Sequence, residues 1–173
     1  MAAMTEHMRH TWTTQSADET KRLAAAFSAC LQTGDVVVLN GDLGAGKTQF
    51  VQGVAGALGV QAAVTSPTFN ILQTYPVQKD GDSSRPTVIN HFDLYRLENM
   101  EELDDIGYWE ALEDNGVSFI EWGDKFPDQL PDDYLEVAIV VSPEATRTLE
   151  ARAHGTRSEE LLACWTHVAG EQA

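Results

Sequence analysis

One short run of sequence constrains the fold of this chain more than any other. Residues 41–48 read G-D-L-G-A-G-K-T and satisfy the pattern G-x-x-x-x-G-K-[ST]. They follow a β-branched run, residues 36–39, that is typical of a buried strand. They precede residues 50–58, whose apolar side chains recur at helical spacing and which Gly59 ends. Strand, glycine-rich loop and helix in this order predict a phosphate-binding loop.

Each fixed position of the motif has a chemical reason. Glycines let the backbone adopt positive φ and approach oxygen atoms closely, so that consecutive N–H groups surround a phosphate. The helix that begins near Lys47 adds the positive end of its dipole. The lysine bridges β- and γ-phosphates in such loops, and the Thr48 hydroxyl is placed to coordinate Mg²⁺. The loop residues expected to bind a nucleotide are Gly41, Asp42, Leu43, Gly44, Ala45, Gly46, Lys47 and Thr48.

Nucleotide hydrolysis also needs an acid near the metal ion and a group that organises the attacking water. Two expected strands end in acids: residues 88–92 lead to Asp93, and residues 117–120 lead to Glu121. The second strand is the more apolar and is similar to a Walker B strand with Glu in place of Asp. The pattern leaves open which acid lies nearer the metal. The alternative for either acid is a surface residue or a helix-capping partner.

Hydroxyl side chains gather between the loop and these acids. Thr65, Ser66 and Thr68 flank Pro67, which stiffens the segment. Such a segment can sense a γ-phosphate and reorder on hydrolysis. The alternative is a polar connection that binds nothing.

Two further residues near the acids have plainer interpretations. His91 has no His or Cys neighbour at ligand spacing, which favours a packed or hydrogen-bonded strand histidine over a zinc ligand. Trp122 follows Glu121 directly, and strand alternation points it to the opposite side, which favours core packing.

The remaining pattern predicts further regular elements. Ser16, with Glu19 three residues on, is typical of a capped helix N-terminus. The acid-rich residues 98–114 carry apolar side chains at three-residue steps, which indicates short helical turns with a solvated acidic face. The other expected elements are a hairpin of residues 70–77 and 87–94, strands at 117–122, 135–141 and 147–153, and a terminal helix.

The chain is strongly acidic, with 27 Asp and Glu against 11 Lys and Arg and a formal net charge of −16. Stand-alone binding of nucleic acid needs a basic face, so a nucleic acid would need a partner protein. Cys30 and Cys164 offer neither a disulfide framework nor zinc-ligand spacing, which suits a reducing compartment. We expect them to be small apolar side chains. Residues 1–12 lack the apolar core of a signal peptide and no apolar run could span a bilayer, which predicts a cytoplasmic protein.

Taken together, these residues resemble the bacterial TsaE family, small ATPases of tRNA threonylcarbamoyladenosine biosynthesis. The resemblance spans residues 16–155. It is carried by the loop at 41–48, Ser-Pro-Thr-Phe at 66–69, His-Phe-Asp-Leu-Tyr-Arg-Leu at 91–97 and Ile-Glu-Trp at 120–122, all in family order. The loop is shared with many NTPases, whereas the other three together are specific.

The resemblance implies an α/β fold, a P-loop NTPase-like three-layer sandwich with a mixed, partly parallel sheet. It divides the chain into a polar arm (1–15), a P-loop ATPase domain (16–155) and a C-terminal helical extension (156–173). Thr48 and Glu121 match the metal positions, Asp93 with Lys47 the catalytic ones, and Thr65 to Thr68 the first switch. Gln49 is also expected to bind the nucleotide, and it stands where many relatives have a threonine that contacts the α-phosphate.

The resemblance also implies a function. It predicts a weak or partner-dependent ATPase with ATP and Mg²⁺ as cofactors, which resets or activates a complex of the transferase TsaD with TsaB and meets tRNA only through that complex. Two other classes stay open: a kinase, although residues 98–114 lack the arginines of a kinase lid, and a nucleotide-dependent binding module that does not hydrolyse. No motif identifies an adenine contact.

Overall fold

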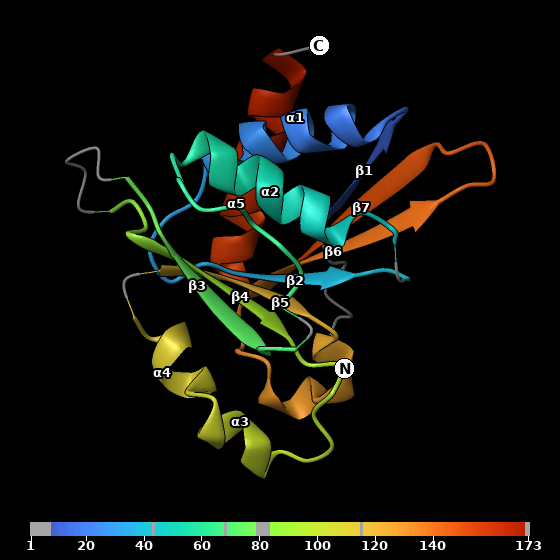
Figure 1. Cartoon of the computed structure of the whole chain (residues 1–173). Helices are drawn as coiled ribbons and strands as arrows, with labels where there is room; N and C mark the ends of the chain where they lie inside the picture. Colours follow the sequence, from blue (N-terminus) through green and yellow to red (C-terminus); the bar gives the residue numbers. More distant parts are fainter. Residues whose placement is uncertain (1–7, 43, 68, 79–83, 115, 172–173) are drawn as a thin grey trace, which may run out of the picture.

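A mixed sheet forms the middle layer of the protein, and helices cover both of its faces (Figure 1). The structure is a computed structural model that describes residues 8–42, 44–67, 69–78, 84–114 and 116–171. One face carries α1 (Ala17–Ser28), α2 (Lys47–Ala57) and α5 (Thr156–Glu171). The other carries α3 (Glu101–Asp105) and α4 (Tyr108–Leu112). The expected three-layer α/β sandwich is therefore confirmed.

The sheet is parallel in its centre and antiparallel at both edges. Its strands are β1 (Arg9–Thr14), β2 (Val36–Asn40), β3 (Leu72–Pro76), β4 (Val88–Asp93), β5 (Gly116–Glu121), β6 (Tyr134–Val141) and β7 (Arg147–His154). Within the described residues they follow the order β1-β7-β6-β2-β5-β4-β3. Strands β6, β2, β5 and β4 run parallel, whereas β3 pairs antiparallel with β4, and β7 pairs antiparallel with β6 and with β1.

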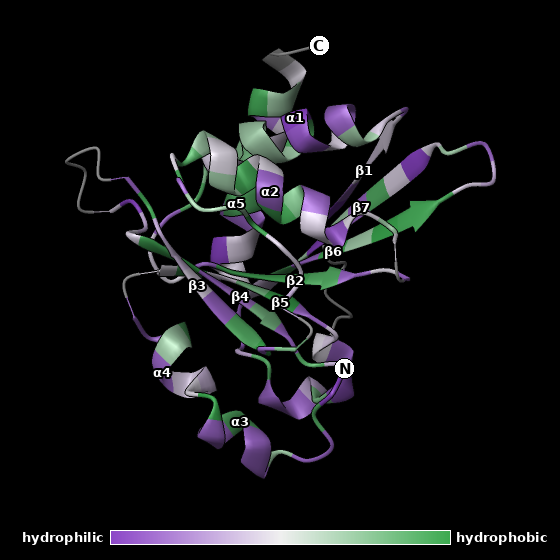
Figure 2. Ribbon diagram, viewed as in Figure 1, coloured by the Kyte–Doolittle hydropathy of each residue, from purple (hydrophilic) through white to green (hydrophobic). Residues whose placement is uncertain are grey.

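Two apolar cores lie on the two faces of the sheet, and β2 contributes to both. Val37 and Leu39 pack into the core beneath α1, α2 and α5, while Val36 and Val38 pack into the core of the α3–α4 face. This division follows from the two-residue period of a strand and explains why residues 36–39 are uniformly apolar. Figure 2 shows mostly apolar residues along β2 and mostly hydrophilic residues on α3.

Local sequence signals account for most of these elements. The Glu19 N–H donates to Ser16 Oγ at 3.1 Å, which confirms the predicted cap of α1. The predicted hairpin is formed by β3 and β4, although its connecting residues 79–83 lie outside the described chain. None of the helices in the described part of the chain has the length and apolar composition of a membrane-spanning segment.

Strand β1 is the element that the sequence analysis missed. Its residues, Arg9–Thr14, fell within the expected polar arm, yet they pair antiparallel with β7 along their whole length. The strand is exposed along most of its length, so it lacks the apolar alternation by which a half-buried strand is recognised. Register with β7 rather than side-chain burial defines it.

Helix α5 belongs to the core. Trp165 is fully buried and its ring centroid lies 4.5 Å from that of Phe27 on α1. At the start of the helix, Arg157 donates to both carboxylate oxygens of Asp35 at 2.8 Å, and this hydrogen bonding raises the pKa of the guanidinium. Residues 156–171 therefore complete the layer that covers one face of the sheet.

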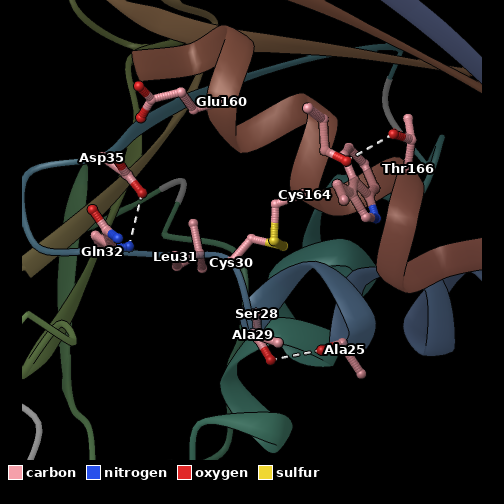
Figure 3. The surroundings of a disulfide bond; sticks show 12 residues. Ala25, Ser28, Ala29, Cys30, Leu31, Gln32, Asp35, Glu160, Cys164 and Thr166 are labelled. Atoms are coloured by element: carbon pink, nitrogen blue, oxygen red, sulfur yellow. Dashed lines mark hydrogen bonds between the residues drawn. A yellow bond between two sulfur atoms is a disulfide. The ribbon is translucent and has the colours of Figure 1, made fainter.

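A disulfide joins this helix to the turn that follows α1, and it contradicts the expectation that both cysteines are simple apolar residues. Cys30 and Cys164 are bonded although 134 residues separate them in sequence (Figure 3). The pairing follows from the packing of α5 across α1, which a pair of isolated cysteines in the sequence does not reveal.

Reduction of the disulfide should lower stability without unfolding the protein. A bond that closes a loop of this length constrains the unfolded chain, so its loss should lower the free energy of unfolding by about 2–4 kcal/mol. Thermal melts with and without dithiothreitol measure this shift, and the Cys164→Ser variant should be insensitive to the reductant. Thiol titration of the denatured, unreduced protein should find no free thiol; two free thiols would contradict the assignment.

Candidate functional site

Three parallel strands end at one edge of the sheet, and the chemistry-bearing residues gather there. Strand β2 ends at Asn40 and passes directly into the glycine-rich loop. Glu121, the last residue of β5, lies opposite Leu39 on β2 and opposite Asp93, the last residue of β4. The register of the parallel pairs thus brings the loop and both predicted acids together, although they are far apart in sequence. Ligands of open α/β sheets bind at this edge.

The loop packs tightly against the neighbouring strand β6. A Cβ at Gly41 would lie 2.7 Å from the backbone oxygen of Ile139, so only glycine permits this approach. Gly44 and Gly46 adopt φ of +81° and +115°, the left-handed region in which glycine is favoured. These conformations turn the backbone around the start of α2, as a phosphate-binding nest requires. Leu43 lies outside the described residues.

Lys47, the first residue of α2, is 5% exposed and turns back into the loop. Its Nζ donates to the backbone oxygen of Gly41 at 2.8 Å and lies 3.6 Å from Glu121 Oε1. The ammonium also lies 4.6 Å from the ring centroid of Trp122. One cation therefore connects the loop to the end of β5.

Glu121 is held by a second contact from the neighbouring strand. Its Oε2 lies 2.6 Å from Nε2 of His91, which is fully buried on β4. His91 is thus a hydrogen-bonded strand histidine, the interpretation favoured from its sequence. Sequence reasoning missed its partner, because only the β4–β5 register places the two side chains together. The contact fixes the direction of the carboxylate.

Asp93 lies beside Glu121 and is 4% exposed. Its Oδ1 accepts a hydrogen bond of 3.0 Å from the N–H of Tyr95, in the turn that follows β4. Neither acid is a surface residue, so the alternative of exposed carboxylates does not hold. Whether these residues, the loop residues and Gln49 carry the roles expected of them stays a prediction.

A cavity of about 240 Å³ connects the loop with both acids. The residues that line it are Gly44, Gly46, Lys47, Thr48 and Gln49 of the loop and helix, together with Ser66, Asp93, Glu121 and Trp122. Of the three expected switch residues, Ser66 is therefore at the site. Thr65 is exposed and does not line the cavity, and Thr68 lies outside the described residues.

Trp122 borders the cavity and also packs, partly buried, against the core of the α3–α4 face, so the expectation of core packing describes only part of its surroundings. Strand β5 ends at Glu121, and Trp122 adopts φ of +63°, so strand alternation no longer fixes its direction. Its ring lies 5.0 Å from that of Tyr95 and beneath the ammonium of Lys47. No pattern in the sequence marks this break in the strand.

These residues fit a Mg²⁺–nucleotide complex. The positive-φ glycines leave the space that a phosphate needs, since nothing lies within 4 Å of a Cβ built on Gly44. In the described part of the chain no three His, Cys, Asp or Glu residues form a ready-made metal site. A cation would therefore take ligands from Thr48, one acid and phosphate oxygens, as Mg²⁺ does in phosphate-binding loops.

Comparison with known proteins establishes the family. The family model described as "Threonylcarbamoyl adenosine biosynthesis protein TsaE" matches residues 14–149. This chain belongs to the TsaE family. That family is involved in the biosynthesis of threonylcarbamoyladenosine in tRNA, and its members are nucleotide-binding proteins of the P-loop type.

Individual relatives are similar to this chain over most of its length. The tRNA threonylcarbamoyladenosine biosynthesis protein TsaE of Bacillus subtilis (strain 168) is 38% identical over 150 residues, which cover 87% of this chain and 89% of that protein. The TsaE protein of Treponema pallidum (strain Nichols) is 38% identical over 135 residues, 78% of this chain and 94% of the relative. The crystal structure of YdiB from Bacillus subtilis superposes with a TM-score of 0.75 at 32% identity, covering 93% of this chain and 96% of that one.

The roles of the two acids should be distinguishable when each side chain is changed to its amide. Glu121→Gln should weaken Mg²⁺-dependent nucleotide binding by about tenfold or more, because the carboxylate held by His91 faces the phosphate loop. Asp93→Asn, its matched control, should reduce hydrolysis more than binding. Nucleotide titrations at graded Mg²⁺ and single-turnover hydrolysis measure the two effects. Variants that lose only thermal stability would show that both acids are structural.

Proposed function

We propose that this protein is a Mg²⁺-dependent ATPase that supports threonylcarbamoyladenosine formation in tRNA by resetting or activating a TsaB–TsaD transferase complex. The observation that carries the proposal is the contact between Lys47 of the loop and Glu121 of β5, with Asp93 alongside in one cavity. A loop that only turned the chain would not need a buried cation and two buried acids at its mouth.

The loop residues supply binding and orientation. Backbone N–H groups of residues 44–48 and the positive end of α2 would hold the β-phosphate, and Lys47 would exchange its bond to the Gly41 carbonyl for phosphate oxygens. Thr48 and Glu121 would hold Mg²⁺, which draws charge from the phosphate oxygens. His91 keeps the glutamate carboxylate in place.

Asp93 is the residue of the site suited to orient the attacking water. Its carboxylate lies next to Glu121 across the β4–β5 register, and Asp93 lines the cavity beside the loop. Ser66, which lines the same cavity, would report the γ-phosphate, as expected of the switch segment. Trp122 closes one wall and shields the ammonium from water.

The net negative charge of the chain affects which partners it would contact directly. A net charge of −16 repels a polyanion such as tRNA, so contact with tRNA would come through the partner proteins. Helix α3 begins with Glu101 and Glu102, and this acidic surface suits a basic protein face. Because tRNA is the substrate of the pathway, we place the protein in the cytoplasm.

Removal of the Lys47 side chain should reduce ATP hydrolysis without unfolding the protein. Lys47→Ala should lower ATP turnover by about 100-fold or more, since one preorganised charged donor contributes on that order. Lys21→Ala on α1 is the control for the loss of a lysine. The measurement is phosphate release from labelled ATP, alone and with the transferase pair.

Three outcomes distinguish the open functions. Free phosphate that rises when TsaB and TsaD are added supports the proposal. Label on an acceptor molecule would indicate a kinase, and nucleotide binding without either product would indicate a binding module. Unchanged turnover in the Lys47 variant would contradict the assigned site. Because Lys47 contacts a buried carboxylate, thermal melts must accompany the assay.

A further inference from the structure

Within the described residues the sheet ends in two edge strands, β1 and β3, and β3 is protected against pairing with another chain. Val77 N–H donates to Thr87 O, so the neighbouring pair, Pro76 with Val88, is the non-hydrogen-bonded kind in the antiparallel ladder. Pro76 therefore occupies a position whose N–H would point outward, and proline has none. A strand added to β3 would lack a donor there.

Strand β1 lies beside β7 at the other end of the sheet (Figure 1) and presents an open backbone edge. Ala153 N–H donates to Met8 O, so these two residues are a hydrogen-bonded pair of the β1–β7 ladder, and every second residue of β1 follows the same pattern. The residues between them direct N–H and C=O away from β7, to a side where no described strand pairs with β1. These residues are Arg9, Thr11 and Thr13.

The side chains of β1 favour strand pairing. The strand contains three threonines and Trp12, residue types that are enriched in β-strands, and no proline. Residues 7–17 contain no Asp or Glu, although the whole chain carries 27 of them. Two acidic molecules can therefore approach each other along β1 without placing carboxylates opposite one another.

A second copy of β1 fits this edge when the two strands run antiparallel about Thr11. Thr11 then lies opposite Thr11 of the second copy, and Arg9 lies opposite its Thr13, so that each pair exchanges both backbone hydrogen bonds. On the other face of the strand, His10 lies opposite Trp12 of the second copy, an aromatic pair of the kind that stabilises sheets. The edge is thus complementary to itself, as a two-fold interface requires.

Charge complementarity favours the same occupant. Strand β1 begins with a cation, Arg9, and only two residues separate the end of the strand from α1. The first turn of α1 carries Asp18 and Glu19. Antiparallel pairing places the start of each strand beside the end of the other, so that each arginine approaches the acidic turn of the second copy.

We propose that the outer edge of β1 pairs antiparallel with β1 of a second copy, forming a two-fold dimer with one continuous sheet. Assembly stops at the dimer, because the outer strand at each end is then β3, with Pro76 facing outward. A strand pair alone buries less surface than a standard interface, so the dimer is transient and forms at high protein concentration. Strands β7 and β6 separate β1 from β2, which leads to the phosphate loop, so the loop of each copy stays open.

A cysteine placed on the two-fold axis tests the register. Thr11→Cys should form a disulfide with its own copy, since the Cα atoms of hydrogen-bonded pairs lie about 5.5 Å apart, within the range of a disulfide. Thr13→Cys is the matched control, because it would face Arg9 and not itself. Under mild oxidation with copper phenanthroline, covalent dimer should be about fivefold or more as abundant for Thr11→Cys, linked through position 11 in peptide mass spectrometry. Equal yields, or no covalent dimer in either variant, would overturn the proposal.

Two other substitutions at Thr11 test the contact without a crosslink. Thr11→Pro removes the outward N–H but none of the β1–β7 ladder bonds. Thr11→Lys covers the case in which the proline disturbs β1, since it places like charges opposite one another. Sedimentation velocity over a roughly hundredfold range of concentration should show dimerisation of the native protein, weakened about tenfold or more in both variants. Thr74→Lys, at an exposed position of β3, should dimerise as the native protein does. A native protein that stays monomeric, or Thr11 variants that associate as it does, would contradict the β1 contact.

Hydrogen exchange followed by NMR needs no variant. The amides of Arg9, Thr11 and Thr13 should exchange about tenfold more slowly when the protein is concentrated, because dimerisation pairs them. The amides of His10 and Trp12 already donate to β7 and should change less. Exchange that is independent of concentration would overturn the proposal, as would protection that appears only when a different protein is added.

Discussion

The buried ammonium of Lys47 holds the functional edge of this protein together. It joins the carbonyl of Gly41 at the start of the loop, the carboxylate of Glu121 at the end of β5 and the ring of Trp122. A buried carboxylate is costly unless it is paired and hydrogen-bonded, and here Lys47 and His91 provide both contacts. The loop, two strands and the following turn are therefore positioned as one unit.

Sheet topology makes this contact possible. Parallel pairing of β2 with β5, and of β5 with β4, places three strand ends at one edge, and antiparallel β7 extends the sheet on the side of β6. The loop thus lies between a polar cavity, bounded by Asp93 and Glu121, and a groove bordered by Val140 and Val141. The side that carries the two acids suits phosphate chemistry.

Much of this arrangement could be predicted from local sequence. The loop motif, the apolar run of β2 and the Ser16 cap each report a local conformation, and the structure has all three. The features that the sequence did not predict depend on contacts between distant residues. Strand β1 forms only through its pairing with β7, and the disulfide forms only because α5 packs on α1. The sequence analysis considered His91 and Trp122 but could not predict their contacts. The β4–β5 register decides what His91 contacts, and the end of β5 decides where Trp122 points.

We propose that the loop and Glu121 together hold one Mg²⁺–nucleotide complex. A crystal structure with Mg²⁺ and a non-hydrolysable ATP analogue tests it most directly. We expect the β-phosphate within the N–H groups of the loop, Lys47 Nζ on phosphate oxygens instead of Gly41 O, and the metal between Thr48 and Glu121. A nucleotide bound outside the loop, or a loop that retains the bond from Lys47 to Gly41 with the nucleotide present, would contradict the account.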